Sequence, residues 1–330
     1  MVRLATRASP LALWQARHVA SLLESANPGL AVELLPVRTT GDRQSEVPVW
    51  EMGGRGVFVG ELQAAVLAGR ADAAVHSAKD LQPIEPPGLC LAAVPERADP
   101  RDALVGARLA ELGPGAVVAT GSQRRRAQLA ALVPGLVFKS LRGNISTRLD
   151  KVPPGGAVVM ALAALQRLGL QPEPLEVLST DVMLPQVAQG AIGVECRAGD
   201  ERTMELLSCA DDASTRATVE AERAFLAALG GGCDLPVAAY ATWLPATSHA
   251  PGPSIARQAA GPTSQPEALG RSGGRLSLTG LLAAADGSVL VRQQANGPAD
   301  DPASLGQEVA RAVLAAGGEE LLASFRESRP

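Results

Sequence analysis

Arginines gather where predicted strands give way to predicted helices. Three such junctions carry polar, helix-starting residues: Ser9-Pro10, Thr120-Gly121-Ser122 and Arg142-Gly143-Asn144. A helix N-terminus presents free N–H groups, and ligands of open α/β sheets bind at the carboxyl ends of the strands. Guanidinium groups hold carboxylates or phosphates through two parallel hydrogen bonds. We therefore predict a cleft for a polyanionic ligand, with these arginines at or beside it: Arg3, Arg7, Arg124, Arg125, Arg142 and Arg148.

Three of the arginines are consecutive, Arg124 to Arg126, at the start of a predicted helix. Three cations at a helix N-terminus oppose the helix dipole. For Arg126 we accept the simple interpretation of a solvated helix face. For the group as a whole we expect an anion to offset the charge.

Asp80 is the first candidate for acid–base chemistry. It follows Lys79 at the end of a predicted strand, where a loop can bring both side chains into a cleft. A carboxylate near cations stays ionised, so it could stabilise a cationic intermediate or shuttle a proton. Taken alone, however, a Lys-Asp pair is more often a surface ion pair.

Cys233 is the candidate for covalent attachment. It follows three glycines, which have no side chains to shield its thiol. The remaining cysteines lie in apolar or helical contexts and are interpreted as structural. They are Cys90, Cys196 and Cys209. No CxxC pair occurs, so we predict no metal site.

The composition narrows the class of protein. The net charge is −4 from 30 basic and 34 acidic residues, which gives no global attraction to nucleic acid or to an anionic membrane. No apolar run approaches the roughly 20 residues that span a bilayer, and the N-terminus does not resemble a signal peptide. We expect a cytoplasmic protein with reduced thiols.

The elements that position these residues alternate between strands and helices. Strands are predicted near residues 2–6, 31–37 and 71–75, with helices from Pro10 and over residues 61–68. The same alternation restarts after Pro100. It predicts two α/β domains, each built on a parallel sheet with helical crossovers.

The last third of the chain has a different pattern. A helix over residues 214–229 precedes three predicted strands, and Asp286-Gly287 is a hairpin turn signal between the last two. Two helices close this predicted small α+β domain. Residues 244–274 are rich in Pro, Gly, Ser and Ala without periodicity, which favours a flexible insertion.

Six segments together resemble the hydroxymethylbilane synthase (porphobilinogen deaminase) family, and they cover nearly the whole chain in the family's order. They are RLATRASPLALWQA (3–16), GGRGVFVGE (53–61), RADAAVHSAKDL (70–81), SLRGNISTRL (140–149), QGAIGVECR (189–197) and GGGCDLP (230–236). The resemblance implies two α/β domains like type II periplasmic binding proteins plus a small α+β C-terminal domain. The implied boundaries are 1–95 with 189–208, 96–188, and 209–330.

The resemblance also implies an activity. The family joins four porphobilinogen molecules head to tail, with loss of ammonia, into the linear tetrapyrrole hydroxymethylbilane. Its primer is a dipyrromethane cofactor made from its own substrate and bound through a thioether, here matched by Cys233. Asp80 matches the family's catalytic aspartate, which stabilises the cationic azafulvene formed when ammonia leaves. The expected substrate is porphobilinogen, and we expect a monomer whose product passes to uroporphyrinogen-III synthase.

The remaining site residues are also carried over by motif. The implied cofactor contacts are Ser77, Lys79, Thr120, Ser122, Arg124, Arg125, Ser140, Arg142 and Gln189. The expected substrate contacts are Arg3, Arg7, Gln15, Phe58, Arg148 and Arg167. Each pyrrole unit bears an acetate and a propionate, which agrees with an arginine-lined cleft. Arg55, Gly121 and Gln123 depart from the residues usual in the family.

Three other classes compete with this interpretation. A two-lobed binding protein would share the fold but predicts a signal peptide and no role for Cys233. A cysteine-dependent redox or acyl-transfer enzyme needs a nearby base, and the histidines are only His18, His76 and His249. Nucleic-acid binding lacks both a basic balance and aromatic stacking residues.

Overall fold

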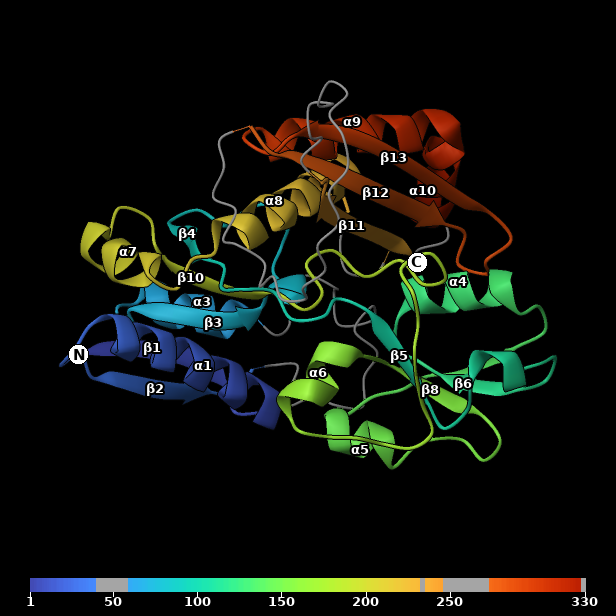
Figure 1. Ribbon diagram of the computed structural model, residues 1–330, viewed down its shortest axis with the longest axis horizontal. Helices are drawn as coiled ribbons and strands as arrows, with labels where there is room; N and C mark the ends of the chain where they lie inside the picture. Colours follow the sequence, from blue (N-terminus) through green and yellow to red (C-terminus); the bar gives the residue numbers. More distant parts are fainter. Residues whose placement is uncertain (40–58, 232–234, 246–272, 328–330) are drawn as a thin grey trace, which may run out of the picture.

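The computed structural model describes residues 1–39, 59–231, 235–245 and 273–327. They form two five-stranded α/β sheets and one three-stranded antiparallel sheet covered by helices (Figure 1). This arrangement confirms the predicted fold class. Within the described ranges, no helix has the length and apolar character needed to cross a membrane.

The first sheet has the strand order β2-β1-β3-β10-β4. Its strands are β1 (Val2–Arg7), β2 (Val32–Val37), β3 (Ala73–Ser77), β4 (Leu89–Ala93) and β10 (Ile192–Arg197). Its helices are α1 (Pro10–Ala26), α3 (Gly60–Leu67) and α7 (Glu201–Ser208). Leu4 and Val194 are fully buried in the core between this sheet and its helices. Residues from 192–197 thus return to the first sheet after the chain has built the second.

The second sheet has the strand order β7-β6-β8-β5-β9. This is the same arrangement as in the first sheet, with β5 in the position that β10 has there. They are β5 (Asp102–Val105), β6 (Val117–Ala119), β7 (Val137–Lys139), β8 (Ala157–Ala161) and β9 (Leu175–Val177). The helices are α4 (Gln123–Leu132), α5 (Ile145–Leu149) and α6 (Leu162–Arg167). Two short 3-10 turns are η1 (Ala78–Asp80) in the first lobe and η2 (Leu109–Glu111) in the second.

Neither sheet is wholly parallel, so that part of the prediction was wrong. In the first lobe β10 runs antiparallel to β3 and β4, and in the second β5 runs antiparallel to β8 and β9. Each of these strands is the one by which the chain enters that sheet from the other lobe. An entering strand runs back along the sheet, whereas strands joined by helical crossovers run parallel.

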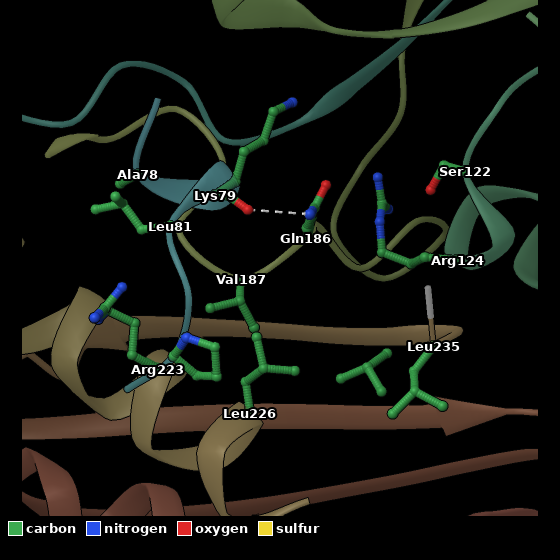
Figure 2. A pocket seen from close by; sticks show the side chains of 12 residues that line it. Ala78, Lys79, Leu81, Ser122, Arg124, Gln186, Val187, Arg223, Leu226 and Leu235 are labelled. Atoms are coloured by element: carbon green, nitrogen blue, oxygen red, sulfur yellow. Dashed lines mark hydrogen bonds between the residues drawn. The ribbon is translucent and has the colours of Figure 1, made fainter. Parts of the chain in front are cut away.

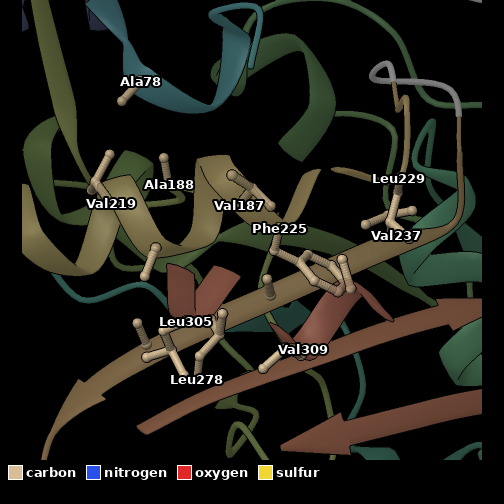
Figure 3. Close-up of a cluster of buried hydrophobic side chains, with 14 of the residues drawn as sticks. Ala78, Val187, Ala188, Val219, Phe225, Leu229, Val237, Leu278, Leu305 and Val309 are labelled. Atoms are coloured by element: carbon tan, nitrogen blue, oxygen red, sulfur yellow. The ribbon is translucent and has the colours of Figure 1, made fainter. Parts of the chain in front are cut away.

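The third sheet has the order β11-β12-β13 and is covered by helices. Its elements are α8 (Ala213–Ala228), β11 (Val237–Trp243), β12 (Arg275–Ala283), β13 (Leu290–Pro298), α9 (Pro302–Val313), the π-helical turn η3 (Leu314–Gly318) and α10 (Glu319–Glu327). Figure 3 shows Phe225 of α8 among Leu305, Val309 and Val237. A Cβ at Gly280 would lie 2.5 Å from the Phe225 ring, so glycine permits this close packing of helix on strand. The predicted insertion lies largely outside the described residues.

The third domain is attached to the two segments that connect the lobes. Glu222 of α8 is fully buried, and its carboxylate pairs with both Nη atoms of Arg97, at 2.7 and 3.1 Å. The same carboxylate accepts from the backbone N–H groups of Ala188 (2.6 Å) and Ala241 (3.0 Å). Arg97 lies on the outgoing connection and Ala188 on the returning one. One side chain therefore ties both connections to the third domain.

Candidate active site

A cavity of about 720 Å³ lies between the two α/β lobes. Its walls come from the loop before α1, from β3 and η1, and from the starts of α4 and α5. These are the carboxyl ends of β1, β3, β6 and β7, where open α/β sheets bind their ligands. The fold thus brings together segments that are far apart in the sequence.

Nine of the predicted site residues line this cavity. They are Arg7, Gln15, Ser77, Lys79, Asp80, Ser122, Arg125, Arg142 and Arg148. The structure adds Arg38, which sequence reasoning missed although it directly follows β2. Among the described lining residues there are six cationic side chains and one carboxylate, that of Asp80.

Side-chain caps fix the loops that carry these residues. Ser9 accepts from the N–H of Ala12 at the start of α1, and Asn144 accepts from Thr147 at the start of α5. Ser122 caps α4 in the same way. A capping oxygen satisfies one of the free N–H groups at a helix start and typically contributes about 1 kcal/mol. The cavity wall is therefore held by the same serines and asparagine that mark the helix starts in the sequence.

The cations of the cavity crowd one another. Burial, followed by the charges of Arg125, Arg142 and Arg7, lowers the pKa of Arg148 to about 10. Burial and Arg125 likewise lower the pKa of Lys79 to about 8, although Asp80 acts in the opposite direction. Such shifts mean that additional negative charge in the cavity would be favourable. The site is suited to a ligand with several carboxylates.

The anion expected beside the consecutive arginines is partly supplied by the protein. Asp102, the first residue of β5, is fully buried and pairs with Arg124 Nη1 (2.8 Å) and Arg125 Nη2 (2.7 Å). Burial alone would raise the pKa of Asp102, but the two guanidinium groups hold it well below its usual range. Arg126 is exposed and lies over the ring of Phe138. Sequence reasoning missed Asp102 because β5 was not predicted.

Arg124 faces a second, smaller cavity of about 30 Å³, with Arg223 of α8 on the opposite side (Figure 2). Both side chains are buried. Within the described residues, Nε and Nη2 of Arg124 and Nη1 of Arg223 have no hydrogen-bond partner. Lys79 and Ser122 line both cavities. Buried donors without acceptors fit an anionic group in this region.

Arg3 is not brought to the cavity, contrary to expectation. It lies near the start of β1, at the opposite end from the cavity. Its Nη2 pairs with Asp72 at 3.1 Å, and its side chain is 37% exposed. A residue at the amino end of a parallel strand cannot reach a site at the carboxyl ends.

Four other predicted residues lie beside the cavity without lining it. Thr120 is buried and its hydroxyl accepts from the Ser122 N–H, whereas Ser140 is exposed after β7. Gln189 is fully buried behind Lys79. Arg167 donates to the Gly190 carbonyl at 2.7 Å and lies over the Trp14 ring. Burial lowers the pKa of Arg167 to about 10.

Phe58 and Cys233 lie outside the described residues. The chemistry available from the rest of the site is clear nonetheless. Six cations can hold carboxylates, while Asp80 can carry a proton or face a developing positive charge. Across the described ranges no group of three or more His, Cys, Asp or Glu side chains could hold a metal ion.

Two solved structures resemble this chain distantly. The substrate-binding protein of an amino acid ABC transporter is 13% identical, with a TM-score of 0.35, and covers 63% of this chain and 89% of its own. The periplasmic domain of B. pertussis BvgS is 19% identical, with a TM-score of 0.35, and covers 63% and 39%. TM-scores this low support no conclusion about the fold. The fold class is therefore based on the strand order and direction of the sheets.

Sequence relatives are much closer. Residues 2–205 match the family model "Porphobilinogen deaminase, dipyromethane cofactor binding domain", and residues 216–256 match the C-terminal domain of that family. A porphobilinogen deaminase of Syntrophotalea carbinolica is 42% identical over 98% of this chain and 96% of its own. Those of Roseiflexus castenholzii and Stenotrophomonas maltophilia are each 45% identical, over 96% and 97% of this chain and 97% and 98% of theirs. With matches of this extent, a cation-lined cavity and one carboxylate within it, this chain belongs to the porphobilinogen deaminase family.

Proposed function

We propose that this chain joins four porphobilinogen molecules head to tail, with loss of one ammonia at each addition, and that water then releases the product as hydroxymethylbilane. The observation that carries the proposal is the inter-lobe cavity, whose described lining residues include six cations and one carboxylate, that of Asp80. Each pyrrole brings an acetate and a propionate, so a growing chain adds two negative charges at every step. The lowered pKa values of Lys79 and Arg148 are what such charges would relieve.

We propose that Asp80 is the catalytic residue. It lies on η1, immediately after β3, and its neighbour Lys79 accepts a hydrogen bond at its carbonyl from Gln186 (3.4 Å; Figure 2). That contact fixes the turn that carries the carboxylate. Facing the substrate pyrrole, Asp80 would offset the positive charge that develops as ammonia leaves, and would take up the proton lost when the new C–C bond forms.

The cations of the cavity would bind the carboxylates of the substrate and of the growing chain. Arg7, Lys79, Arg125, Arg142 and Arg148 line the cavity from both lobes, so a bound chain would be held between them. Guanidinium groups also orient a carboxylate through paired hydrogen bonds. A dipyrromethane bound through Cys233 would supply the nucleophilic pyrrole carbon that starts chain growth. We further propose a cytoplasmic monomer that passes its linear product to uroporphyrinogen-III synthase, because a linear tetrapyrrole needs an enzyme that closes the ring.

The intact mass of the purified protein tests the proposal. We expect extra mass equal to two linked pyrrole units in the wild type and none in Cys233→Ser. Cys209→Ser is the matched control, because Cys209 is an exposed free thiol on α7's C-terminal side and should leave the added mass in place. A wild type that stays unmodified after incubation with porphobilinogen would contradict the proposed function.

A further inference from the structure

Asp102 is a buried carboxylate that lies behind the cavity rather than in its wall. It is fully buried at the start of β5. Its Oδ1 accepts from Arg125 Nε (3.0 Å) and Nη2 (2.7 Å), and its Oδ2 faces Arg124 Nη1 at 2.8 Å. Arg125 therefore holds this carboxylate through two charge-assisted hydrogen bonds, whereas Arg124 is an ion-pair partner whose Nη1 donates to the Leu184 carbonyl.

Gln189 extends this arrangement to the ammonium group of Lys79. Its Nε2 donates to Asp102 Oδ1 (2.9 Å) and to the Pro100 carbonyl (2.8 Å). Its Oε1 accepts from Lys79 Nζ at 3.3 Å and from Arg125 Nη2 at 3.5 Å. The side chain is fully buried, so these bonds leave it one orientation. Lys79 is thus joined to the Asp102 carboxylate through one amide, and Arg125 contacts the same carboxylate directly.

The charges near Lys79 oppose one another. Arg124 and Arg125 repel its ammonium group, whereas Asp80 and Asp102 attract it. Asp80 faces the cavity, where we place the reacting substrate. Asp102 is the remaining carboxylate among these four groups, and solvent does not screen it. Like charges placed together without a counter-charge disfavour the charged form.

We propose that Asp102 is a positioning residue that holds the Lys79 ammonium and the Arg125 guanidinium at the cavity wall, with Gln189 as the bridge. Its importance for catalysis rests on the proposed function, but the positioning does not. Loss of the Asp102 charge removes an attraction from Lys79 and leaves both repulsions. The pKa of Lys79, about 8 in the native protein, should therefore fall in Asp102→Asn. Two linked hydrogen bonds separate Asp102 from Lys79, and removing a charge at that separation should lower the pKa of Lys79 by about one unit or more.

Lys79 can be observed directly because the chain has only three lysines, with Lys139 and Lys151 as the others. Reductive methylation with ¹³C-formaldehyde labels each one, and the methyl resonances report each titration by NMR. We expect the Lys79 midpoint to move to lower pH in Asp102→Asn, while Lys139 and Lys151 stay in place. The two proteins must have equal cofactor content by intact mass, because cofactor carboxylates would also act on Lys79. Introducing Cys233→Ser into both proteins removes the cofactor from each of them.

Asp99→Asn is the matched control. Asp99 lies three residues from Asp102 and pairs with Arg101, whose side chain is 44% exposed. Its loss should leave the Lys79 midpoint unchanged. If Asp102→Asn fails to fold, Gln189→Met removes the bridge and keeps both ion pairs, and it should lower the Lys79 midpoint by a smaller amount. An unchanged Lys79 midpoint in a folded Asp102→Asn or Gln189→Met protein would overturn the inference.

The titration of Lys79 can be measured whether or not the protein turns over substrate. A wild type without attached cofactor would contradict the proposed function and leave the lysine titration interpretable. In an active enzyme, Asp102→Asn should move the alkaline limb of the pH profile of kcat/KM to lower pH, together with the titration midpoint of Lys79. A mere loss of packing would lower activity at all pH values without moving that limb.

Discussion

At the scale of single residues, Asp80 stands apart because it is the sole carboxylate among the described residues that line the cavity. We expect Asp80→Asn to fold normally, because the replacement has the same shape, and to lower kcat by about 10²- to 10⁴-fold, the usual contribution of a proton-transferring group. Steady-state assays of porphobilinogen consumption measure this. Asp72→Asn is the control, since Asp72 pairs with Arg3 outside the cavity. Equal kcat values for Asp80→Asn and the wild type would exclude Asp80 as the catalytic group.

Arg148 tests the carboxylate-holding role of the cations. Its Nε donates to the Gly143 carbonyl at 2.8 Å, which fixes the side chain at the cavity wall. A hydrogen bond to a charged group contributes about 1.5–3 kcal/mol, so Arg148→Leu should raise the KM for porphobilinogen by about 10- to 150-fold. Arg126→Leu, which removes an exposed arginine outside the cavity, should leave KM unchanged. If both variants bind substrate equally well, Arg148 does not hold its carboxylates.

The residues that could be predicted are those whose motif fixes both their type and their place. Asp80, Lys79 and Arg148 lie in the cavity as the sequence indicated. Arg3 does not, although the predicted strand begins at Val2 as β1 does, because a side chain near the amino end of that strand lies away from the cavity. Asp102 could not be found from its neighbours in sequence. The only signal was the unbalanced charge of three consecutive arginines, which predicted a nearby anion but did not identify Asp102 as part of it.

At the scale of elements, most strands were predicted from their apolar runs, whereas β4, β5 and β9 were not. These three strands have only three to five residues each. Turn residues do flank them, with Gly88 before β4, Gly106 after β5 and Pro174 before β9, but so short a segment between turns also fits a loop. They form because partners already present satisfy their backbone groups, as when Ala103 of β5 pairs with Met160 and Val177 on either side. The direction of β10 has the same origin, since Ile192 pairs with the distant Ser77. Such non-local pairing leaves no local pattern to read.

At the scale of the whole molecule, the third domain meets the two lobes through shared apolar clusters and through a few buried polar contacts. The two lobes are joined by the connections that contain Arg97 and Ala188, and Glu222 of the third domain binds both. Arg97 Nε also donates to the Gln189 carbonyl at 2.9 Å, next to the amide that bridges Asp102 and Lys79. A continuous hydrogen-bonded path therefore runs from α8 to the cavity cations. The third domain thereby fixes the connections about which the lobes are arranged.

Glu222→Gln tests this arrangement. The variant loses the charge that balances Arg97, and its Nε2 cannot accept from a backbone N–H of Ala188 or Ala241. Removing one partner of a buried ion pair costs about 3–5 kcal/mol, so the free energy of unfolding measured in urea should fall by about that amount. Hydrogen exchange should also quicken in both connections, because both lose their anchor to the third domain.

Glu220→Gln is the matched control on the same helix. Glu220 pairs with Arg216 at 3.4 Å and its side chain is 43% exposed, so its loss should cost about 0–1 kcal/mol and leave the exchange of the connections unchanged. If the two variants destabilise the protein equally, Glu222 contributes no more than a surface ion pair. If Glu222→Gln lowers stability without faster exchange in the connections, the contact stabilises the third domain alone. Faster exchange in both connections would instead establish that one buried carboxylate holds the connections between the two lobes to the third domain.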